Sequence, residues 1–527
     1  MRTAAKVLAL TLLLALRPAC GGGGGGGGGS GTGASLPSLP LPVAPVPAAV
    51  STGGLAPVAT PGATTISVTG KGDDVVQNEL QAALTAGGNV IVATGGGPRT
   101  IVLGVPLTIP SNRTVILDGL DQITLSGGLS TRILQLNDNV QLTLQRLRFV
   151  DARSDQNGAA VDMINFVRQV TVINCTFDNC QTREGGPDRG GGALRIWSGP
   201  HTQISGCTFN RCAASNGGAV NSLGTRLTIL NSTFTQNAAF GTGGGAELGP
   251  TGRGGIGGAV YVDNVSNDPA AQHQLQIAGC VFNANVANDH AGAVFGYTDK
   301  SKPSTTVIDQ CTFAGNVVVG GHGNAGALYS QDGTLTLTNS TFNLNTAAGE
   351  GGGIFRPSDS ALTSTSNVTN CTFQGNSAGG HGGGLWIGAS AVNLLNVTVA
   401  ENVAGDFAGG IFLSGPTVTV QNCVFESNAA TGNPPAGNQT NGTFSGTANI
   451  QAPNTAGGAG KAVTSGAGTT KVASALLGPL QDNGGATYTR LPQLGSPAIN
   501  LATGAPATDQ RGVSRVGAAD SGSCEAP

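Results

Sequence analysis

Six aromatic residues occupy one position of a repeated sequence phrase, and they are the strongest candidate for a binding surface. The phrase is glycine, then alanine or glycine, then an aliphatic residue, and the aromatic residue follows directly, as in Gly292-Ala293-Val294-Phe295. Successive residues of a strand point to opposite faces, so an inward aliphatic residue places the ring outside. An exposed strip of rings stacks on the apolar faces of sugar units. The six residues are Tyr261, Phe295, Tyr329, Phe355, Trp386 and Phe412.

The same pattern allows two other interpretations, and the sequence leaves the choice open. Either the rings lie inside and the aliphatic residues outside, or loops at the side of the molecule cover the rings. If the rings are exposed, one ring per strand spacing of about 4.8 Å gives a strip about 25 Å long. The ligand that such a strip favours is a polysaccharide or a cell-surface glycan.

Carboxylates near these rings are weaker candidates for catalysis. Asp263, Asp299 and Asp332 follow their aromatic residues by two, four and three positions. A polysaccharide lyase would hold Ca²⁺ with carboxylates stacked at one strand position and would use Arg195 or Lys300 as its base. The unequal offsets argue against one stacked row, and solvated turn residues are the alternative interpretation. No aspartate pair on adjacent repeats supports two-carboxylate hydrolysis, and no cofactor is expected beyond the calcium of the lyase hypothesis.

Cysteines are a second candidate for chemistry. Apart from Cys20, six of nine lie at one recurring position, where serine alternates with them. The alternation predicts small side chains that fill a narrow core, and no Cys or His spacing supports a metal site. Cys180 and Cys212 share one turn position in consecutive repeats, where Cα atoms lie about 5 Å apart, and are a candidate disulfide in an oxidising compartment. Cys524 has no evident partner.

A second phrase, centred on phenylalanine, indicates which elements position these residues. It contains two aliphatic residues two positions apart, Cys or Ser three positions after the second, Phe two positions later and Asn three positions after Phe. Most copies are 25–32 residues apart, and one step of 48 contains the glycine-rich stretch 241–256, interpreted as an inserted loop. The aliphatic pair and the Cys/Ser-x-Phe segment each alternate as in a strand, but the second starts three residues after the first ends. In a single straight strand this odd offset would turn the second segment to the opposite face. The side chains of both segments point inward only if the chain turns a corner between them.

Three short strands per repeat, without helical periodicity, predict one coil of a parallel β-solenoid. Stacking buries the inner face of each coil, and parallel crossovers are right-handed by default. With less regular strand patterns from residue 88 onward, the sequence predicts an all-β, right-handed parallel β-helix (solenoid) of about 11–12 coils. A short amphipathic helix over 74–84 is expected to cap the first coil. The asparagine row is expected to form a structural ladder at a turn that tolerates left-handed backbone.

The N-terminus carries the features of an export signal. Arg2 and Lys6 precede the apolar run 7–16, which is too short to span a bilayer. Cys20 opens a run of nine glycines and resembles the lipobox cysteine of bacterial lipoproteins, although Arg17 replaces the usual aliphatic residue. The resemblance implies a signal peptide over 1–20 and membrane attachment through lipidation of Cys20, with free secretion as the alternative. Residues 21–64 are expected to form a flexible Gly/Pro-rich linker.

Composition narrows the functional class. Of 527 residues, 87 are glycine and 10% are charged, but 39% are hydrophobic and no Gly-X-Y period runs through the chain. Collagen is therefore excluded, and general disorder is disfavoured. The net charge of −3 provides no basic surface, so nucleic acid is not an expected partner. No later segment has eighteen consecutive apolar residues, so no transmembrane helix is expected after the N-terminus. We expect the protein to be a monomer.

Two family resemblances follow from these motifs. The phenylalanine phrase, Cys-Thr-Phe followed by Asn, alternates with Gly-Gly-Ala along the chain. This alternation resembles the repeat of polymorphic outer membrane proteins. The resemblance implies a right-handed β-helix of the pectate-lyase-like fold over 65–430. Four segments near the end resemble the choice-of-anchor Q domain, which implies a C-terminal domain over 431–527. These segments are Leu477–Leu480, Asp482–Gly485, Gly495–Asn500 and Asp509–Gly512. Asn500 departs from the family's usual Asp, and the ending around Cys524 departs from its usual aromatic residue.

Together these patterns predict an exported bacterial lipoprotein, at the outer membrane or cell surface, that adheres or binds glycans without catalysis. The alternative is a polysaccharide lyase or glycoside hydrolase of the pectate-lyase-like fold. For that alternative, Gly321-His322-Gly323 and Gly380-His381-Gly382 resemble a Gly-His-Gly segment of polygalacturonases. A purely structural spacer is the third hypothesis.

Overall fold

The computed structural model describes most of the chain after residue 53. The described residues are 43, 46–49, 53–164, 166–186, 189–241, 254–263, 273–297, 304–357, 364–388, 391–414, 417–432, 439–441, 444–453 and 468–527. Cys20, Asp299 and Lys300 therefore lie outside the described residues, as do the predicted signal peptide and most of the predicted loop over 241–256. No helix among the described residues is long and apolar enough to cross a membrane.

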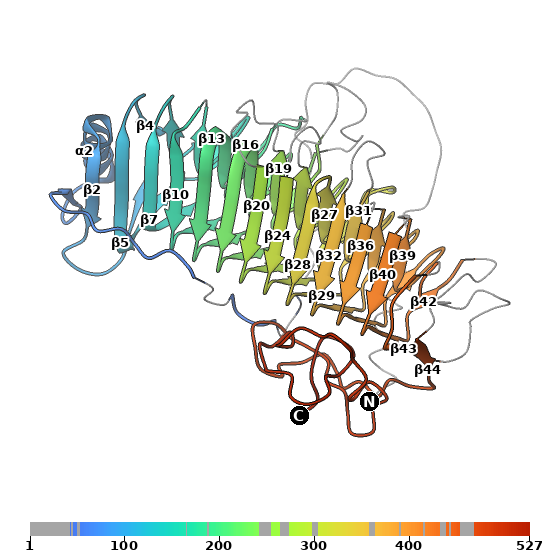
Figure 1. Ribbon diagram of the computed structural model, residues 1–527. Coiled ribbons are helices and arrows are strands. Elements are labelled where there is room, and N and C mark those ends of the chain that lie inside the picture. Colours follow the sequence, from blue (N-terminus) through green and yellow to red (C-terminus); the bar gives the residue numbers. More distant parts are fainter. Residues whose placement is uncertain are drawn as a thin grey trace, which may run out of the picture. The chain divides into compact units, whose positions relative to one another are not determined.

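Each regular coil contains four short strand segments, which stack on the next coil in four parallel rows (Figure 1). Row 1 holds the glycine–aliphatic phrase, row 2 the aliphatic pair and row 3 the phenylalanine phrase. Row 4, which the sequence analysis did not separate, is a strand of two residues after each turn. The fold is a right-handed parallel β-helix of about twelve coils, as predicted.

The strand bounds follow the repeat. Row 1 contains β4 (Leu107–Ile109), β6 (Leu134–Leu136), β9 (Val161–Met163), β19 (Val260–Asp263), β23 (Val294–Tyr297), β27 (Leu328–Gln331), β31 (Ile354–Arg356), β35 (Leu385–Ile387) and β39 (Ile411–Leu413). Row 2 contains β1 (Thr64–Ser67), β2 (Gly88–Ala93), β10 (Gln169–Ile173), β20 (His273–Ala278), β24 (Ser304–Asp309), β28 (Thr334–Thr338), β32 (Thr365–Thr369), β36 (Ala391–Leu395) and β40 (Thr417–Gln421). Four longer strands serve two rows: β5 (Thr114–Ser126) and β7 (Gln141–Val150) in rows 2 and 3, and β13 (Leu194–Ser205) and β16 (Val220–Leu230) in rows 1 and 2.

The other two rows complete each coil. Row 3 contains β3 (Arg99–Val102), β11 (Thr176–Asp178), β14 (Thr208–Asn210), β17 (Thr233–Thr235), β21 (Val281–Asn283), β25 (Thr312–Ala314), β29 (Thr341–Asn343), β33 (Thr372–Gln374), β37 (Thr398–Ala400), β41 (Val424–Glu426), β43 (Asn449–Ala452) and β44 (Thr469–Lys471). Row 4 contains β8 (Arg153–Ser154), β12 (Gln181–Thr182), β15 (Ala213–Ala214), β18 (Ala238–Ala239), β22 (Val286–Ala287), β26 (Val317–Val318), β30 (Thr346–Ala347), β34 (Ser377–Ala378), β38 (Val403–Ala404) and β42 (Ala429–Ala430).

Inward residues of the rows form one continuous core. In row 3 each phenylalanine lies on the next in register, as Phe282 does on Phe313, with ring centroids 4.8 Å apart. These rings are fully buried, and the recurring cysteines, such as Cys280 and Cys311, belong to the same core. The predicted inward positions of phenylalanine and cysteine are confirmed.

Single residues in left-handed backbone make the corners on either side of row 3. Asn339 (φ 49°) precedes Ser340, and Leu344 (φ 56°) precedes Asn345. The sequence analysis assigned left-handed backbone to the asparagine row itself, but the residue before each asparagine adopts it. The reason is that the buried Asn345 side chain turns inward, where its Nδ2 donates to Asn376 Oδ1 at 2.9 Å. The asparagine row is thus a structural ladder, as expected.

The corner between rows 4 and 1 has no room for a side chain. A Cβ at Gly292 would lie 2.1 Å from the carbonyl oxygen of Gly326 in the next coil. A Cβ at Gly326 would in turn lie 2.1 Å from the carbonyl oxygen of Gly352. Successive coils approach too closely at this column for any residue other than glycine. This steric requirement accounts for the glycine that recurs once per coil.

Helix α2 (Asp73–Ala86) covers the first coil and confirms the predicted cap. Its buried residues are Val76, Leu80, Ala83 and Leu84, which form the apolar face expected from the sequence. Strand β1 precedes the helix and already pairs with β2. The stack therefore begins at Thr64, ahead of the start predicted near residue 88.

The stack also continues past its predicted end at residue 430. Strand β43 pairs with β41, and β44 pairs with β43, so row 3 runs to Lys471. Residues 472–527, which we call the tail, then lie against the outside of the last coils (Figure 1). Gln510, in the predicted Asp-Gln-Arg-Gly segment, is buried and donates from Nε2 to Thr341 Oγ1 at 2.8 Å. The tail thus covers a side of the coils.

Part of the predicted linker is bound to the coils. The described residues 43, 46–49 and 53–60 form what we call the strap. The Val43 N–H donates to Asn283 Oδ1 at 2.9 Å, and Asn283 Nδ2 donates to the Val43 carbonyl at 3.0 Å. Val58 makes the same pair of bonds with the Gln145 amide, at 2.8 and 2.9 Å. At these points the linker is held by side-chain amides, in contrast to the flexible chain that was expected.

Candidate functional site

The six aromatic residues form a single line on the outside of row 1, which we call the outer row. The strand register stacks them in sequence order, from Tyr261 on Phe295 to Trp386 on Phe412. The aliphatic residue before each ring is fully buried in the core, as Val294 is. The aliphatic residues are therefore inside, and the rings face away from the core.

An outward position does not leave every ring accessible. Tyr261, Phe295 and Phe355 are only 8%, 5% and 8% exposed, because they pack with small apolar residues such as Ala291 and Ala325 in a cluster of their own. The interpretation that placed the rings inside the core is therefore wrong. The rings lie outside, and some of them are covered. The more accessible rings are those of Tyr329, Trp386 and Phe412.

A second column, which we call the edge row, runs beside the outer row. Its members lie five residues before successive rings and are His290, Asn324, Glu350, His381 and Phe407. The Asn324 N–H donates to His290 Nδ1 at 3.0 Å, and the Glu350 N–H donates to Asn324 Oδ1 at 2.8 Å. The Glu350 carboxylate accepts the His381 N–H at 2.7 Å and lies 2.9 Å from His381 Nδ1. Hydrogen bonds therefore connect the edge row from coil to coil.

The two rows combine in the last coils to form what we call the aromatic patch. The His381 ring stacks on Phe407 at a centroid distance of 5.2 Å and contacts Phe412 at 4.8 Å. Trp386 stacks on Phe412 at 5.7 Å, and the Glu350 side chain is 27% exposed. These five residues place apolar rings, which stack on one another, beside a carboxylate and an imidazole. Such a surface can pack against the C–H groups of a sugar while it hydrogen-bonds to the hydroxyls.

Towards the first coils the outer row becomes polar. The register places Asp162, Arg195 and Asn221 in line with the rings. Arg195 lies 3.6 Å from the Asp162 carboxylate and 4.5 Å from the centre of the Trp197 ring. Burial raises the pKa of Asp162, against the opposing effect of the positive charges of Arg132 and Arg195. Arg195, the candidate base, is thus held in a buried ion pair.

Asp263 and Asp332, the predicted carboxylates that the structure describes, are not stacked at one strand position. Asp263 ends β19 and lies between Leu223 and Tyr297 in the strand register. Arg195 lies on β13, two coils from Asp263. The geometry therefore does not bring Arg195 and Asp263 together as the lyase hypothesis would require.

Of the remaining members of that constellation, the structure describes Asp332. Asp332 is 3% exposed, and its carbonyl oxygen accepts a hydrogen bond from Arg356 Nη1 at 3.1 Å. Asp299 and Lys300 lie outside the described residues. Within the described part of the chain, no three His, Cys, Asp or Glu side chains are grouped as a metal ion would require.

The candidate cysteine pair occupies the predicted place, but the structure holds it as free thiols. Cys180 and Cys212 take equivalent positions in adjacent coils, and the Ala213 N–H donates to the Cys180 carbonyl at 3.0 Å. Both thiols are buried, and their sulfurs donate to the carbonyls of Phe149 and Phe177. Burial raises the pKa of Cys212 well above its ordinary value. Both side chains therefore act as core residues in the structure.

The edge row is the part of the site that the sequence patterns do not reveal. Of its members, only His381 stands out in the sequence, within a Gly-His-Gly segment. The members differ in residue type, so no motif marks them. The one feature that its members share is their position, five residues before a ring of the outer row. This position could predict the edge row only after the rings were known to lie on one face.

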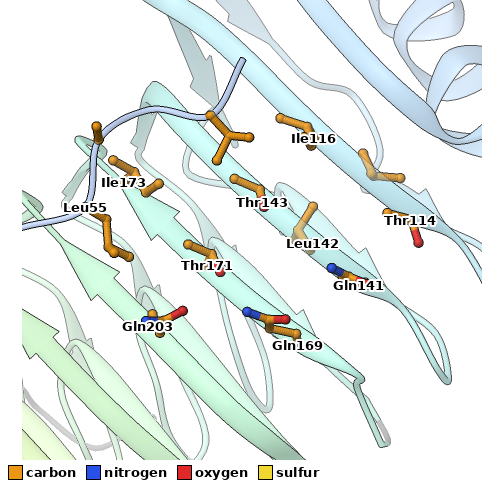
Figure 2. Close-up of a pocket in the computed structure, with 13 residues that line it drawn as sticks. Leu55, Thr114, Ile116, Gln141, Leu142, Thr143, Gln169, Thr171, Ile173 and Gln203 are labelled. Carbon is orange, nitrogen blue, oxygen red and sulfur yellow. The ribbon is translucent and has the colours of Figure 1, made fainter. Parts of the chain in front are cut away.

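A separate concave surface lies under the strap. It is a groove of about 340 Å³ between the strap, with Leu55 and Val58, and the outward side chains of β5, β7, β10 and β13 (Figure 2). Thr143, Gln169 and Gln203 are among the residues that line it, and no lining residue is charged. The strap groove is thus a neutral surface that offers amides and hydroxyls.

Comparison with known families agrees with the fold. Residues 133–342 match the model of the right handed beta helix region. The match begins just before β6 and ends within β29, so the aromatic patch lies beyond it. No curated protein matches the chain.

Three solved structures are similar to this chain at low sequence identity. The chain is similar to a mannuronic acid specific polysaccharide family 6 lyase enzyme from human gut microbiota, with 13% identity, 74% of this chain and 85% of that chain covered, and a TM-score of 0.38. It is similar to the catalytic unit of a thermostable GH87 alpha-1,3-glucanase from Streptomyces thermodiastaticus, with 14% identity, 80% and 71% covered, and a TM-score of 0.41. It is also similar to PfbA, a surface adhesin of Streptococcus pneumoniae, with 12% identity, 82% and 95% covered, and a TM-score of 0.36. None of these likenesses assigns a role to a residue of this chain.

Proposed function

We propose that this chain is an exported surface protein that binds glycans through the aromatic patch without cleaving them. The observation that carries the proposal is the geometry of Trp386, Phe412 and His381, whose half-buried rings lie outside the core beside Glu350. The aliphatic residues of the same strands already fill the core, so these rings are not needed to fill it.

The arrangement suits an extended carbohydrate better than a compact ligand. The rings recur once per coil along the axis, with neighbouring centroids 4.6–5.7 Å apart in the outer row. A linear glycan that lies along this direction contacts several rings at once, and weak contacts at linked units add. The Glu350 carboxylate accepts hydrogen bonds from sugar hydroxyls, which fixes the orientation of the chain.

Export and anchoring rest on the sequence of the N-terminus. The charged and apolar segment before Cys20, followed by nine glycines, supports a lipoprotein signal and a tether at the outer membrane or cell surface. Expression of the full chain and of Cys20→Ser tests this part. We expect the native chain in the membrane fraction and Cys20→Ser in the soluble fraction, and equal partition of the two would contradict lipid anchoring.

Binding is tested by co-sedimentation of the full chain with insoluble neutral and acidic polysaccharides. Trp386→Ala should weaken binding about tenfold, because an aromatic stacking contact is worth about 1 kcal/mol or more. Trp197→Ala is the matched control, since Trp197 is 39% exposed but lies outside the aromatic patch. Equal binding by Trp386→Ala and the native chain would refute the assignment to the patch.

Cleavage of a polysaccharide is the second candidate function. It is favoured by one observation, the contact between Glu350 and His381 beside the rings, because a carboxylate–imidazole pair can transfer protons. Release of reducing or unsaturated ends by the native chain, lost in Glu350→Gln, would support this candidate. Binding without release of either product would support the proposal above.

A further inference from the structure

A pocket of about 700 Å³ lies where the strap, the corners after row 3 and the tail meet. We call it the junction pocket. It is lined by Val43 of the strap, by corner residues such as Leu344 and Glu401, and by tail residues such as Asp482 and Tyr488. Its volume is typical of small-molecule sites, about 300–1,000 Å³. The outer row belongs to row 1, so the junction pocket is a separate site.

The guanidinium of Arg490 lines this pocket but is already hydrogen-bonded to protein groups. Arg490 is 7% exposed, and its Nε donates to the Gly478 carbonyl at 2.7 Å. Its Nη1 donates to Gln374 Oε1 at 3.0 Å and to Glu401 Oε1 at 3.3 Å, and its Nη2 lies 3.5 Å from the Glu426 carboxylate. Arg490 therefore holds the tail against the coils and has little capacity left for a ligand.

The carboxylates, in contrast, remain open to a ligand. The Glu401 side chain is 52% exposed. Its Oε1 accepts from Arg490 and its Oε2 accepts from Gln374 Nε2 at 2.8 Å, so each oxygen keeps one lone pair for a ligand. Asp482 accepts the Gly484 N–H at 2.9 Å with Oδ1 and has no ion pair within the described residues. The lining therefore carries two carboxylates against one committed guanidinium, and its net charge is negative. A cationic group gains from this charge, and an anionic ligand is repelled.

The rest of the lining combines apolar surface with uncharged polar groups. Leu344 is 49% exposed, and Val43 and Leu480 lie on the same pocket. Asn343 carries a carboxamide and Tyr488 a phenol, and neither group is hydrogen-bonded within the described residues. A bare alkylamine would leave these polar groups unused, whereas hydroxyls around a ring would satisfy them.

We propose that the junction pocket binds an amino sugar with a free, protonated amine. The amine lies between the Glu401 and Asp482 carboxylates, the hydroxyls meet Asn343 and Tyr488, and the ring lies on the apolar side chains. This site is independent of the glycan proposal for the aromatic patch. The neutral strap groove provides an internal contrast, because it offers amides and hydroxyls but no carboxylate.

The test is isothermal titration of the full chain that carries Trp386→Ala, so that the aromatic patch does not contribute. The probes are a β-1,4-linked glucosamine tetramer, its N-acetylated counterpart, a galacturonate tetramer and free lysine. The glucosamine tetramer should bind at least tenfold more tightly than the other three. Equal affinity for the N-acetylated tetramer would overturn the role of the amine, and equal affinity for lysine would overturn the role of the sugar.

Two variants locate the site. Asp482→Asn should lower the affinity for the glucosamine tetramer about tenfold, and Asn keeps the turn because its side-chain oxygen still accepts the Gly484 N–H. Glu401→Gln should have a similar effect, whereas Gln141→Ala in the strap groove should have none. Unchanged binding by Asp482→Asn and Glu401→Gln would overturn the proposal even if the glucosamine tetramer binds elsewhere.

Discussion

Two columns of aromatic rings run through this molecule, one inside and one outside. The inner row consists of row 3 phenylalanines from Phe149 to Phe373, whose centroids are 4.6–4.9 Å apart with interplanar angles of 3–14°. In the outer row the distances are 4.6–5.7 Å and the angles 8–47°. Both rows have one ring per coil, but only the inner row is nearly parallel and almost uniform in residue type.

The difference follows from the number of sides on which each ring is packed. An inner ring such as Phe313 is enclosed by the rest of the core, so one orientation and one side chain fill the space. An outer ring such as Tyr329 has the sheet on one side only, and it is tilted 33° and 47° to its two neighbours. Looser packing permits variation in residue type and leaves ring faces to a ligand. Stability should therefore depend on the inner row and binding on the outer row.

The largest expected effect is on stability, at the centre of the inner row. Phe313→Ala removes a fully buried ring that stacks on Phe282 and Phe342, and leaves a cavity in the core. We expect the free energy of unfolding to fall by about 3–5 kcal/mol. Urea unfolding followed by circular dichroism measures this, and a loss below about 1 kcal/mol would remove the distinction between the rows.

Alkaline pH should destabilise the inside of the molecule by a similar amount. Burial raises the pKa of Cys207, Cys371 and Cys423 to about 12, from an ordinary value of 9.0. Because the folded-state pKa is the higher one, these thiols contribute stability below about pH 9 that is lost as the pH rises towards 12. At pH 10 the loss is about 1.4 kcal/mol for each thiol and about 4 kcal/mol for the three.

The matched control replaces these three cysteines by serine. Serine occupies the same column at Ser232 and Ser340, where each hydroxyl donates to a carbonyl at 2.7 Å. The triple variant should fold and should lose only part of the decline between pH 8 and pH 10, measured as urea midpoints at both values. The rest should persist because burial also raises the pKa of Cys175, Cys212, Cys311 and Cys524. An unchanged decline would show that other groups cause it.

The asparagine ladder should have the next largest effect. Asn345 donates from Nδ2 to the Phe313 carbonyl at 3.0 Å, and its Oδ1 accepts the Asn316 N–H at 3.0 Å. Asn345→Ala would leave these buried backbone groups without partners, at a cost of about 2–3 kcal/mol in unfolding free energy. Asn393→Ala is the control, because Asn393 is exposed and, within the described residues, its side chain bonds to Asn367 alone. Equal losses in the two variants would contradict a special role for the ladder.

The coils could be predicted from the sequence because each argument about one repeat holds for all of them. Phe313 lies on Phe282 in register, so inward positions in one copy are inward in the next, and composition at each position is averaged over many copies. The aliphatic residue before each ring is buried for the same reason. The outward face carried no such constraint, which is why the pattern did not show which of the six rings are covered.

The contacts of the strap and the tail could not be predicted, because they do not repeat. Gln145 holds the Val58 backbone across 87 residues of sequence, and Gln510 reaches Thr341 across 169. Each contact occurs once and uses a polar side chain that resembles ordinary polar surface in the sequence. The edge row does repeat, but its members differ in residue type. The junction pocket depends on both segments, so it exists only in the folded arrangement.

The smallest expected effect on stability is at the outer row, and it completes the comparison. Trp386→Ala removes a half-buried ring that packs on Phe355 and Phe412 but does not enter the main core. We expect a loss of about 1 kcal/mol or less in unfolding free energy, by the same urea measurement, together with the tenfold weaker glycan binding proposed above. A loss as large as that of Phe313→Ala would mean that the outer row is a second core, held together for stability alone. A small loss of stability with a large loss of binding would show that Trp386 is retained for the ligand, because its ring adds little to the packing of the coils.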